Sequence, residues 1–378
     1  MKDKISYQQL REIMRYRDKP LDCIKVERAP LIHEGFPGTF NLSFTEYHWL
    51  KEYGKYVDFD HDFVFSTIQS CIRPEDIPLI GTEKSWKYLG VFEMADMNGA
   101  VALKSKSYSD KIHKNQISDL VSFFGMCRIP PERIYPNYCA GGNVKELTNG
   151  KYNFDFQIPR DIISKEGFLS AGVPENNLIS DKSRDTFLSV NLRKEEPKWG
   201  VSLVHNGWGY RNEINILMPS GKLLDTGTLE RFVWKPVYEG DRIVGLEDAS
   251  CDFTIGAVGL ERLCMAVNEL PRIQDIDCIK PIYDAMEKQT GERNYLAGES
   301  LRALHRINSD IVKFSIKNIG RHRKNRMNKM SRNIPENYDS DFLRELLQVH
   351  SEIQPWHPEI VDGIEPTIDG IERYRRAK

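Results

Sequence analysis

The sequence predicts an α+β protein in which an antiparallel sheet, flanked by helices, is followed by a C-terminal helical segment. Between residues 199 and 255, strand-like runs succeed one another mostly without intervening helices, which favours antiparallel pairing. No G-x-G-x-x-G motif follows a strand, so the pattern excludes a parallel dinucleotide-binding sheet. From residue 277 onward, apolar side chains recur at helical spacing.

The composition is typical of a soluble protein with a large core. The chain has 378 residues, 40% of them hydrophobic, and by length this suggests one large domain and a smaller one. The formal net charge of −2 gives no global basic field, so any RNA contact must come from a local patch. No cleavable apolar leader and no membrane-length apolar run is present. We therefore expect a cytoplasmic protein without a membrane partner.

Cysteine and histidine usage indicates neither disulfides nor a metal cluster. The seven cysteines are odd in number and scattered, with no C-x-x-C spacing, which favours reduced thiols. The nine histidines form no H-x-x-H or H-x-x-x-H pair, so we expect no zinc site.

In the N-terminal part, the pattern predicts helices and a hairpin. Residues 5–17 place apolar side chains on one side at helical spacing, a short strand is expected at 23–26, and another helix at 43–53. Residues 63–73 alternate between apolar and small or polar side chains, and 88–97 form a second strand candidate. An antiparallel hairpin with a long loop explains both runs.

The remaining elements follow in order. A helix is expected at 109–126 and a strand from residue 133, and residues 144–198 are polar and loop-rich. Sheet is expected at 199–218, 229–237, 242–246 and 253–255, and helices at 281–288, 300–318 and 341–351, with a proline-containing tail after residue 354 extended over the surface. We divide the chain into a core, residues 1–275, and a helical segment, residues 276–378.

One end of the hairpin carries groups suited to a nucleotide. Arg73 stands where the first strand stops, and Glu75, two residues on, shares its face by strand period. A guanidinium fork suits a phosphate, a carboxylate accepts from the amino group of a base, and Phe92 on the returning strand can stack on that base. The alternative is a surface Arg–Glu pair beside a core phenylalanine.

A second stretch, residues 256–263, combines glycines with an arginine. Gly256 and Gly259 precede an apolar-periodic segment, and glycines ahead of a helix let the backbone approach a ligand. Arg262 in the first turn of that helix can point at a phosphate.

These pieces, in this order, resemble the catalytic domain of alanyl-tRNA synthetases, a family of class II aminoacyl-tRNA synthetases. The resembling runs are P-L-I-H at 30–33, F-N-L-S-F-T at 40–45, Q-S-C-I-R at 69–73, F-E-M at 92–94, G-L-E-R at 259–262 and D-I-D at 275–277. The likeness covers roughly residues 5–330.

The resemblance implies activation of an amino acid by ATP and Mg²⁺. Arg73 would contact the α-phosphate and Arg262 the γ-phosphate, while Glu75 would bind the adenine amino group and Phe92 would stack on the ring. Glu213 would hold magnesium through an oxygen ligand, with a purely structural glutamate as the alternative.

The amino-acid pocket is implied to contain Trp199 and Gly259, although a core tryptophan is an equal alternative for Trp199. The family has an aspartate shortly before G-L-E-R, and counting back places Ile255 there. Asp252 is therefore expected to bind the substrate amino group, with Glu213 and Asp96 as alternatives, or else the substrate is not alanine.

The segment 321–332 is basic, with Arg321, Arg323, Lys324 and Arg326 as candidate RNA contacts. In the family such a helical segment holds the tRNA acceptor arm; the alternative is a solvated helix face. The sequence leaves the oligomeric state open, with a dimer as one alternative.

We expect an ATP-dependent ligase that transfers the activated amino acid to tRNA. One alternative is the same activation with a small amine, peptide or carrier protein as acceptor, favoured by the lost aspartate and the lack of an editing-domain pattern. The other is a non-catalytic RNA-binding or regulatory paralogue, disfavoured by Arg73, Glu75 and Arg262.

Overall fold

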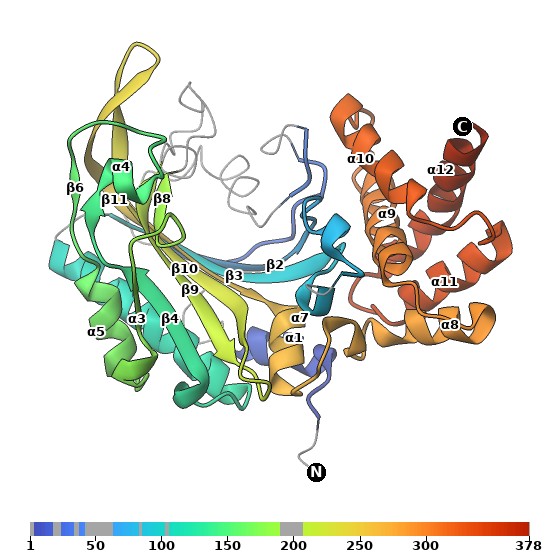
Figure 1. Cartoon of the computed structure of the whole chain (residues 1–378), viewed down its shortest axis with the longest axis horizontal. Coiled ribbons are helices and arrows are strands. Elements are labelled where there is room, and N and C mark those ends of the chain that lie inside the picture. The colour runs from blue at the N-terminus through green and yellow to red at the C-terminus, as the bar shows by residue number, and fades with distance from the viewer. Residues whose placement is uncertain are drawn as a thin grey trace.

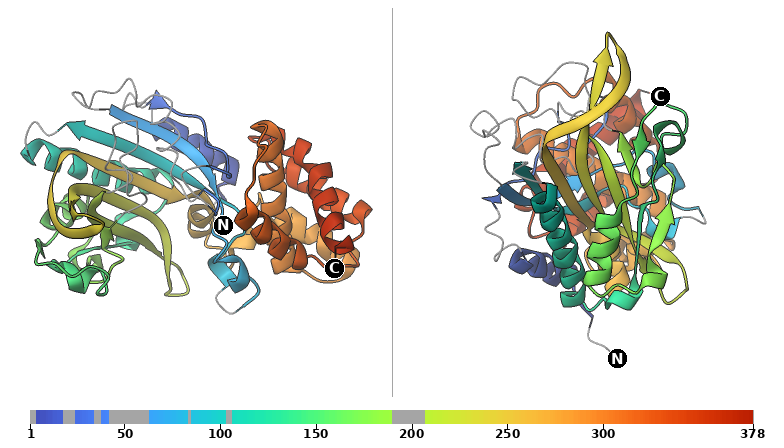
Figure 2. Two further views of the ribbon diagram at one scale, coloured as in Figure 1. Left: turned by 90° about the horizontal axis from the view of Figure 1, so that it is seen from above. Right: turned by 90° about the vertical axis from the view of Figure 1, so that its left-hand side faces the viewer.

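A mixed β-sheet organises the part of the chain that the computed structural model describes, residues 4–17, 24–33, 38–41, 63–82, 85–102, 106–189 and 207–377. The fold is α+β, with helices flanking this sheet (Figures 1 and 2). The strand order is β1-β2-β3-β11-β10-β9-β4-β7, and β8 pairs with β9. The strands are β1 Ile24–Lys25, β2 Phe63–Cys71, β3 Phe92–Ala102, β4 Ile134–Cys139, β7 Ile179–Asp181, β8 Phe187–Ser189, β9 Trp208–Leu217, β10 Leu223–Glu239 and β11 Arg242–Gly259, with β5 Gly142–Asn143 and β6 Gln157–Ile158 in a separate pair.

The helices fall into two groups. Those that pack near the sheet are α1 Tyr7–Arg17, α3 Lys106–Met126, α4 Val144–Leu147, α5 Ile162–Ser170 and α7 Leu260–Val267. Those gathered at one end of the sheet are α8 Lys280–Thr290, α9 Tyr295–Lys313, α10 Arg321–Arg332, α11 Ser340–Glu352 and α12 Ile364–Arg376 (Figure 1). Short 3₁₀ turns are η3 Ile77–Leu79, η4 Ser85–Lys87, η5 Pro131–Arg133, η6 Glu175–Asn177, η7 Ile273–Asp275 and η8 Pro358–Gly363.

The two faces of the central strands contact different parts of the molecule. Because side chains alternate along a strand, Ala95 and Val258 face the main hydrophobic core, while Met94 and Ala257 face the other side. On the core side, α1, α3 and α7 contact one another or the sheet. On the opposite face, Met94 and Ala257 form a small separate apolar cluster with Cys71.

The C-terminal helices share the main core with the sheet. Buried side chains of α8, α9, α11 and α12 belong to the same apolar cluster as those of α1 and α7. Polar contacts reinforce this packing: the Gly90 N–H donates to Glu299 Oε2 over 2.8 Å, and a His357 ring nitrogen lies 2.5 Å from Glu93 Oε1. The core and the helical segment therefore pack as one body.

Several expectations are confirmed. The hairpin of residues 63–97 exists as β2 and β3, and the helices expected at 5–17, 109–126, 281–288, 300–318 and 341–351 correspond to α1, α3, α8, α9 and α11. The expected helix at 43–53 lies outside the described residues.

Two expectations are wrong. The sheet is not purely antiparallel, because the edge strands β1 and β7 pair in parallel with β2 and β4; β4 reaches β7 through a crossover that includes α5, and parallel pairs need such a connection. The tail after residue 354 is not extended, because η8 and α12 occupy it. Ile364, Thr367, Ile368 and Ile371 are buried at helical spacing.

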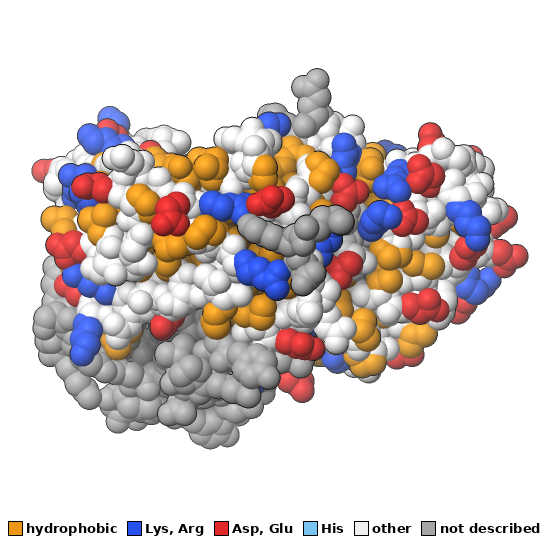
Figure 3. All heavy atoms as spheres, turned by 90° about the horizontal axis from the view of Figure 1, so that it is seen from below, with side chains coloured by type: hydrophobic (Ala, Val, Ile, Leu, Met, Phe, Trp, Pro, Cys, Tyr) orange, Lys and Arg blue, Asp and Glu red, His pale blue; other side chains and the backbone are white. Residues whose placement is uncertain are grey.

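The thiols of Cys71, Cys127, Cys139, Cys264 and Cys278 are buried and form no disulfide with one another. Lys, Arg, Asp and Glu side chains are interspersed over the C-terminal helices on the face shown in Figure 3. Within the described part of the chain, no helix combines the length and the apolar character that a membrane crossing requires.

Candidate active site

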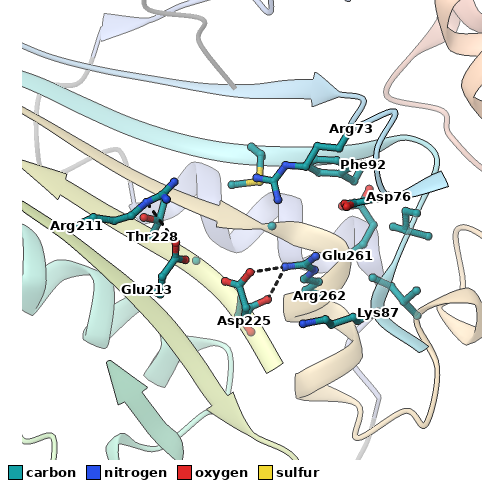
Figure 4. A pocket seen from close by; sticks show the side chains of 16 residues that line it. Arg73, Asp76, Lys87, Phe92, Arg211, Glu213, Asp225, Thr228, Glu261 and Arg262 are labelled. Atoms are coloured by element: carbon teal, nitrogen blue, oxygen red, sulfur yellow. Dashed lines mark hydrogen bonds and ion pairs between the residues drawn. The ribbon is translucent and has the colours of Figure 1, made fainter. Parts of the chain in front are cut away.

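A cavity of about 350 Å³ opens on the side of the sheet away from the main core (Figure 4). Its volume is within the range of small-ligand sites. Eight charged residues line it, four basic and four acidic: Arg73, Lys87, Arg211 and Arg262, and Asp76, Glu213, Asp225 and Glu261. Leu89, Phe92, Met94, Thr228 and Gly259 are among its other lining residues.

The ends of the central strands position several of these groups close together. β2 and β3 pair so that Cys71 lies opposite Phe92, which puts Arg73 just beyond the strand end beside that ring. β11 ends at Gly259, opposite Met94, and α7 begins at the next residue, so Arg262 enters the cavity from the first turn. The predicted convergence of Arg73, Phe92, Gly259 and Arg262 is therefore present.

Two of the four cations are neutralised by carboxylates. Arg262 Nη1 lies 2.7 Å from Asp225 Oδ2 and also donates to the Asp225 carbonyl. Arg211 Nε lies 3.0 Å from Glu230 Oε1 and 3.2 Å from Glu213 Oε1. An anionic ligand would have to compete with these acids for both guanidinium groups.

The other two cations have no such partner. Arg73 lies with its guanidinium carbon 5.4 Å from the centre of the Phe92 ring, and Lys87 has its ammonium 5.7 Å from the centre of the Tyr88 ring. Neither makes an ion pair or hydrogen bond with any described residue. Burial and the nearby Arg262 lower the pKa of Lys87. Asp76, which lines the same cavity, is near both cations without pairing directly with either. A half-buried cation that no carboxylate contacts directly favours an anion.

The acids on β9 and β10 repel one another. Burial, together with Asp225 and Glu230, raises the pKa of Glu213 to about 7, although Arg211 opposes the shift. A bound cation would relieve this repulsion. Among the described residues no cluster of three or more His, Cys, Asp or Glu could hold a metal ion. The pair Glu213 and Asp225 suits Mg²⁺, which takes one or two carboxylates and completes its shell with phosphate and water oxygens.

Behind the cavity, Glu261 joins a buried network. Its carboxylate accepts from the Glu93 N–H at 2.9 Å and from the Tyr7 hydroxyl at 3.1 Å. Glu93 in turn contacts Arg11 and His357. Burial and the adjacent Glu93 carboxylate raise the pKa of Glu261 to about 8. This network fixes the start of α7, and with it the residue next to Arg262.

Asp252 is not a cavity residue, which corrects its predicted role in binding the amino group. β11 pairs with β3 without a bulge from Cys251 to Gly259, so Asp252 faces the side of the sheet opposite Ala257. There Arg231 Nη2 lies 2.7 Å from Asp252 Oδ2, and Ser109 of α3 also bonds to this carboxylate. Asp252 is thus already paired with a cation.

The other pocket predictions differ in outcome. Trp199 lies outside the described residues. Ile255 is buried, facing the same side as Ala257 by strand period, and Asp96 is buried on β3 across from Ala257. Glu75 does not line the cavity; its carboxylate Oε1 lies 3.1 Å from Arg326 Nη1 on α10.

The basic segment forms α10, but its residues are not equivalent. Arg321 and Lys324 are exposed. Arg323 is buried and donates to the carbonyls of Thr39 at 2.6 Å and His33 at 2.7 Å, so its guanidinium is already bonded within the protein and its predicted contact with RNA stays a prediction. Arg326 lines a groove of about 740 Å³ between α10 and the segment 74–78, together with His322, Lys329 and Arg332. We call this the basic groove.

Sequence reasoning missed Lys87, Asp225 and Arg211. Lys87 lies in the long hairpin loop, where a lysine is ordinarily solvated, and Asp225 stands in a strand near a turn. The only available signal was a charged residue inside a run that otherwise predicts buried strand, which applies to Asp225 and Arg211.

Comparisons with known proteins do not identify a family for this chain. No family model matches the sequence, and no curated protein matches it. Among solved structures, one similar chain is the crystal structure of the RNA-binding domain of threonyl-tRNA synthetase from Cryptosporidium parvum Iowa II. The TM-score is 0.44 with 8% sequence identity over 75% of this chain and 74% of that chain. This level of similarity assigns neither a fold family nor an activity.

Proposed function

We propose that this protein is an ATP-dependent ligase that activates the carboxylate of an amino acid as an acyl-adenylate. The observation that carries the proposal is that Arg73 and Lys87, which form no ion pair with a described residue, face one cavity beside the Phe92 ring. The resemblance of the sequence runs around Arg73 and Arg262 to class II aminoacyl-tRNA synthetases supports the same activity.

The reaction is a substitution at phosphorus. A carboxylate oxygen attacks the α-phosphorus of ATP, the bond from that phosphorus to the bridging oxygen breaks, and pyrophosphate leaves with the electron pair. Negative charge gathers on the phosphoryl oxygens, so positioned cations contribute most of the stabilisation. Arg73 would contact the α-phosphate, and Lys87 with Arg262 would bind the leaving pyrophosphate.

Arg262 needs a second event before it can bind phosphate, because Asp225 holds it. Magnesium entering with ATP would be held by Glu213 and Asp225 and would supply positive charge to the phosphates. An Asp225 carboxylate engaged with that ion would leave the Arg262 guanidinium available to the phosphate. This exchange of partners would couple metal and nucleotide binding.

The cavity also limits where the amino group of a substrate can lie. With Asp252 facing α3 and Glu261 bonded to Tyr7 and Glu93, the remaining acids that line the cavity are Asp76, Glu213 and Asp225. An ammonium without a carboxylate partner is costly to bury. We therefore propose that an amino-acid substrate is held by one of these acids, and that alanine is not the preferred substrate if none reaches it.

For the second step we propose the 3′ end of a tRNA-like RNA as acceptor. Its terminal hydroxyl would attack the acyl carbon, AMP would leave, and the proton would pass to solvent. The basic groove beside the cavity supports a polyanionic acceptor. A small amine or carrier protein, which needs no such groove, is the competing acceptor.

The test is ATP–pyrophosphate exchange with a panel of alanine, glycine, serine and amino-free acids, followed by transfer assays with total tRNA. We expect exchange with at least one acid and charging of RNA. Exchange without RNA charging would favour a different acceptor, and wild-type protein that binds no ATP would end the proposal.

A further inference from the structure

A second, much smaller cavity adjoins the candidate active site. Its volume is about 10 Å³, which is close to the space that one water molecule needs. Phe92 and Glu261 line both this cavity and the larger one. Arg302 and Arg306 of α9 also line it, as does Trp356 between α11 and η8. We call this space the rear cavity.

Three N–H groups at the rear cavity are buried and have no hydrogen-bond partner in the described part of the chain. They are Arg302 Nε, Arg306 Nη1 and Trp356 Nε1. The two arginines are four residues apart on α9, so their side chains project from the same face of that helix. No acceptor atom of a described lining residue is buried without a partner. The groups that lack a partner therefore need an acceptor alone.

Arg306 carries a positive charge that no described carboxylate contacts. The residue is 1% exposed, its Nη2 donates to the Ser70 hydroxyl at 2.7 Å, and it forms no ion pair with a described residue. Arg302 differs, because its Nη1 lies 2.7 Å from Glu299 Oε2. Burial lowers the pKa of Arg306 to about 10, and the nearby Arg28 adds to the shift. Burying a charge without a partner is costly, so this guanidinium favours a bound anion.

The acids near Arg306 are bonded to other groups. Asp310 Oδ1 and Glu359 Oε1 each lie 2.6 Å from Arg28 Nη2. Glu93 belongs to the buried network described above. These three carboxylates stabilise the charge of Arg306 from a distance, but none of them bonds to it, so its Nη1 can donate to a ligand.

We propose that the rear cavity binds one monatomic anion, chloride, through Arg302 Nε, Arg306 Nη1 and Trp356 Nε1. A halide accepts several hydrogen bonds and donates none, which matches this lining, whereas a water molecule would also have to place its own two hydrogens. Phosphate, sulfate and carboxylates are too large for a cavity of this volume. Glu261 does not repel the anion, because its raised pKa of about 8 keeps it mainly protonated at neutral pH.

The bound anion would connect α9 to the segment around Trp356 beside the residues that the two cavities share. It would thereby hold Phe92 and Glu261 in place from the side away from the candidate active site. The inference does not depend on the proposed function, because both of its tests read out anion binding without any nucleotide.

The direct test is diffraction from crystals of the full chain soaked in sodium bromide, since bromide replaces chloride and is located by its anomalous scattering. We expect an anomalous peak in the rear cavity within hydrogen-bond distance of the three N–H groups. A water molecule there, without anomalous signal while bromide occupies other places, would overturn the assignment.

The test in solution compares thermal melts in potassium chloride with melts in potassium gluconate, an anion too large for the cavity, at equal ionic strength. A ligand that binds only the folded state stabilises it, so chloride should raise the Tm by about 1–3 °C. Trp356→Phe removes one N–H group but keeps an aromatic ring, and should lose most of this gain. Arg306→Gln should lose all of it.

The matched control is Trp86→Phe, a half-buried tryptophan packed against the main core away from the rear cavity lining, which should keep the gain. If Arg306→Gln does not fold, Trp356→Phe decides the outcome. An equal Tm in chloride and gluconate would refute the site, and so would a chloride gain that Trp356→Phe leaves unchanged. Absence of ATP binding would remove the proposed function but leave this inference standing.

Discussion

At the scale of single residues, the charges left over after ion pairing decide what the cavity can do. We expect Arg73→Ala and Arg262→Ala each to slow ATP–pyrophosphate exchange by roughly a hundredfold or more, since one transition-state donor is worth about 2.7–4 kcal/mol. Lys87→Met should slow exchange at least tenfold. Exchange rates at saturating ATP are the measurement. Arg344→Ala, far from the cavity, should leave them unchanged, and an active Arg73→Ala enzyme would contradict the assigned role.

The aromatic ring has a different expected signature. Phe92→Ala should raise the KM for ATP about tenfold with a smaller effect on kcat, because stacking is present both before and during reaction. Steady-state kinetics with ATP measures both parameters. A loss of kcat without a change in KM would place Phe92 outside the nucleotide contact.

The raised pKa of Glu213 makes stability depend on pH. Its pKa rises from 4.5 to about 7 on folding, so the folded state holds this proton more tightly, and the associated stability is lost as pH increases from 4.5 through 7. Glu213→Gln should therefore raise the Tm relative to wild type at pH 8 by about 2–4 °C and change it little near pH 4.5.

Thermal melts across this pH range measure the difference, with Glu247→Gln as the control at an exposed glutamate paired with Lys235. A pH-independent effect of Glu213→Gln would contradict the shifted pKa. In the same range, binding of magnesium and ATP should strengthen as pH rises, because the metal needs the ionised carboxylate.

At the scale of elements, two glycines near the C-terminal helices provide a matched pair. A Cβ on Gly363 would lie 2.2 Å from Ser309 Oγ and 2.8 Å from the Ser309 backbone nitrogen, whereas a Cβ on Gly370 would meet nothing within 4 Å. Gly363→Ala should therefore destabilise by about 1–3 kcal/mol by forcing α9 and η8 apart. Gly370→Ala, inside α12, should stabilise by about 0.5–1 kcal/mol. Chemical denaturation measures both; a stable Gly363→Ala protein would show that this contact can relax.

The same scale shows what the sequence could and could not predict. The period of the apolar residues predicted α3 and α11, because each of these helices buries one face. It also predicted α9, although residues 297–310 of that helix are buried all round. It failed for α12, where Pro366 in the first turn argued for an extended tail, although proline is tolerated there. The sequence alone does not distinguish the environments of Arg323 and Arg326. Arg323 donates to backbone carbonyls, whereas Arg326 lines the basic groove. The orientation of Asp252 could not be predicted without knowing that Arg231 on the neighbouring strand pairs with it.

At the scale of the whole molecule, the shared core makes the helical segment part of the folding unit. Gly90 to Glu299, Arg28 to Asp310 at 2.6 Å and Glu93 to His357 cross the boundary between residues 275 and 276. We expect a single calorimetric unfolding transition for the full chain. A chain ending at residue 275 should be aggregation-prone, because its apolar surface would be uncovered. Two separate transitions, or a soluble and cooperatively folded chain of 1–275, would contradict this.

The long reach of these contacts also has a consequence for biosynthesis. Arg28 pairs with Glu359, 331 positions later, and the Tyr7 N–H donates to Asp277, 270 positions later. The ribosome must therefore have made residue 359 before Arg28 can form all of its native contacts. Until then, nascent chains carry unpaired charges and uncovered apolar side chains. Such a chain should depend on chaperones that bind it during translation, and slow codons placed early in its message should help it little.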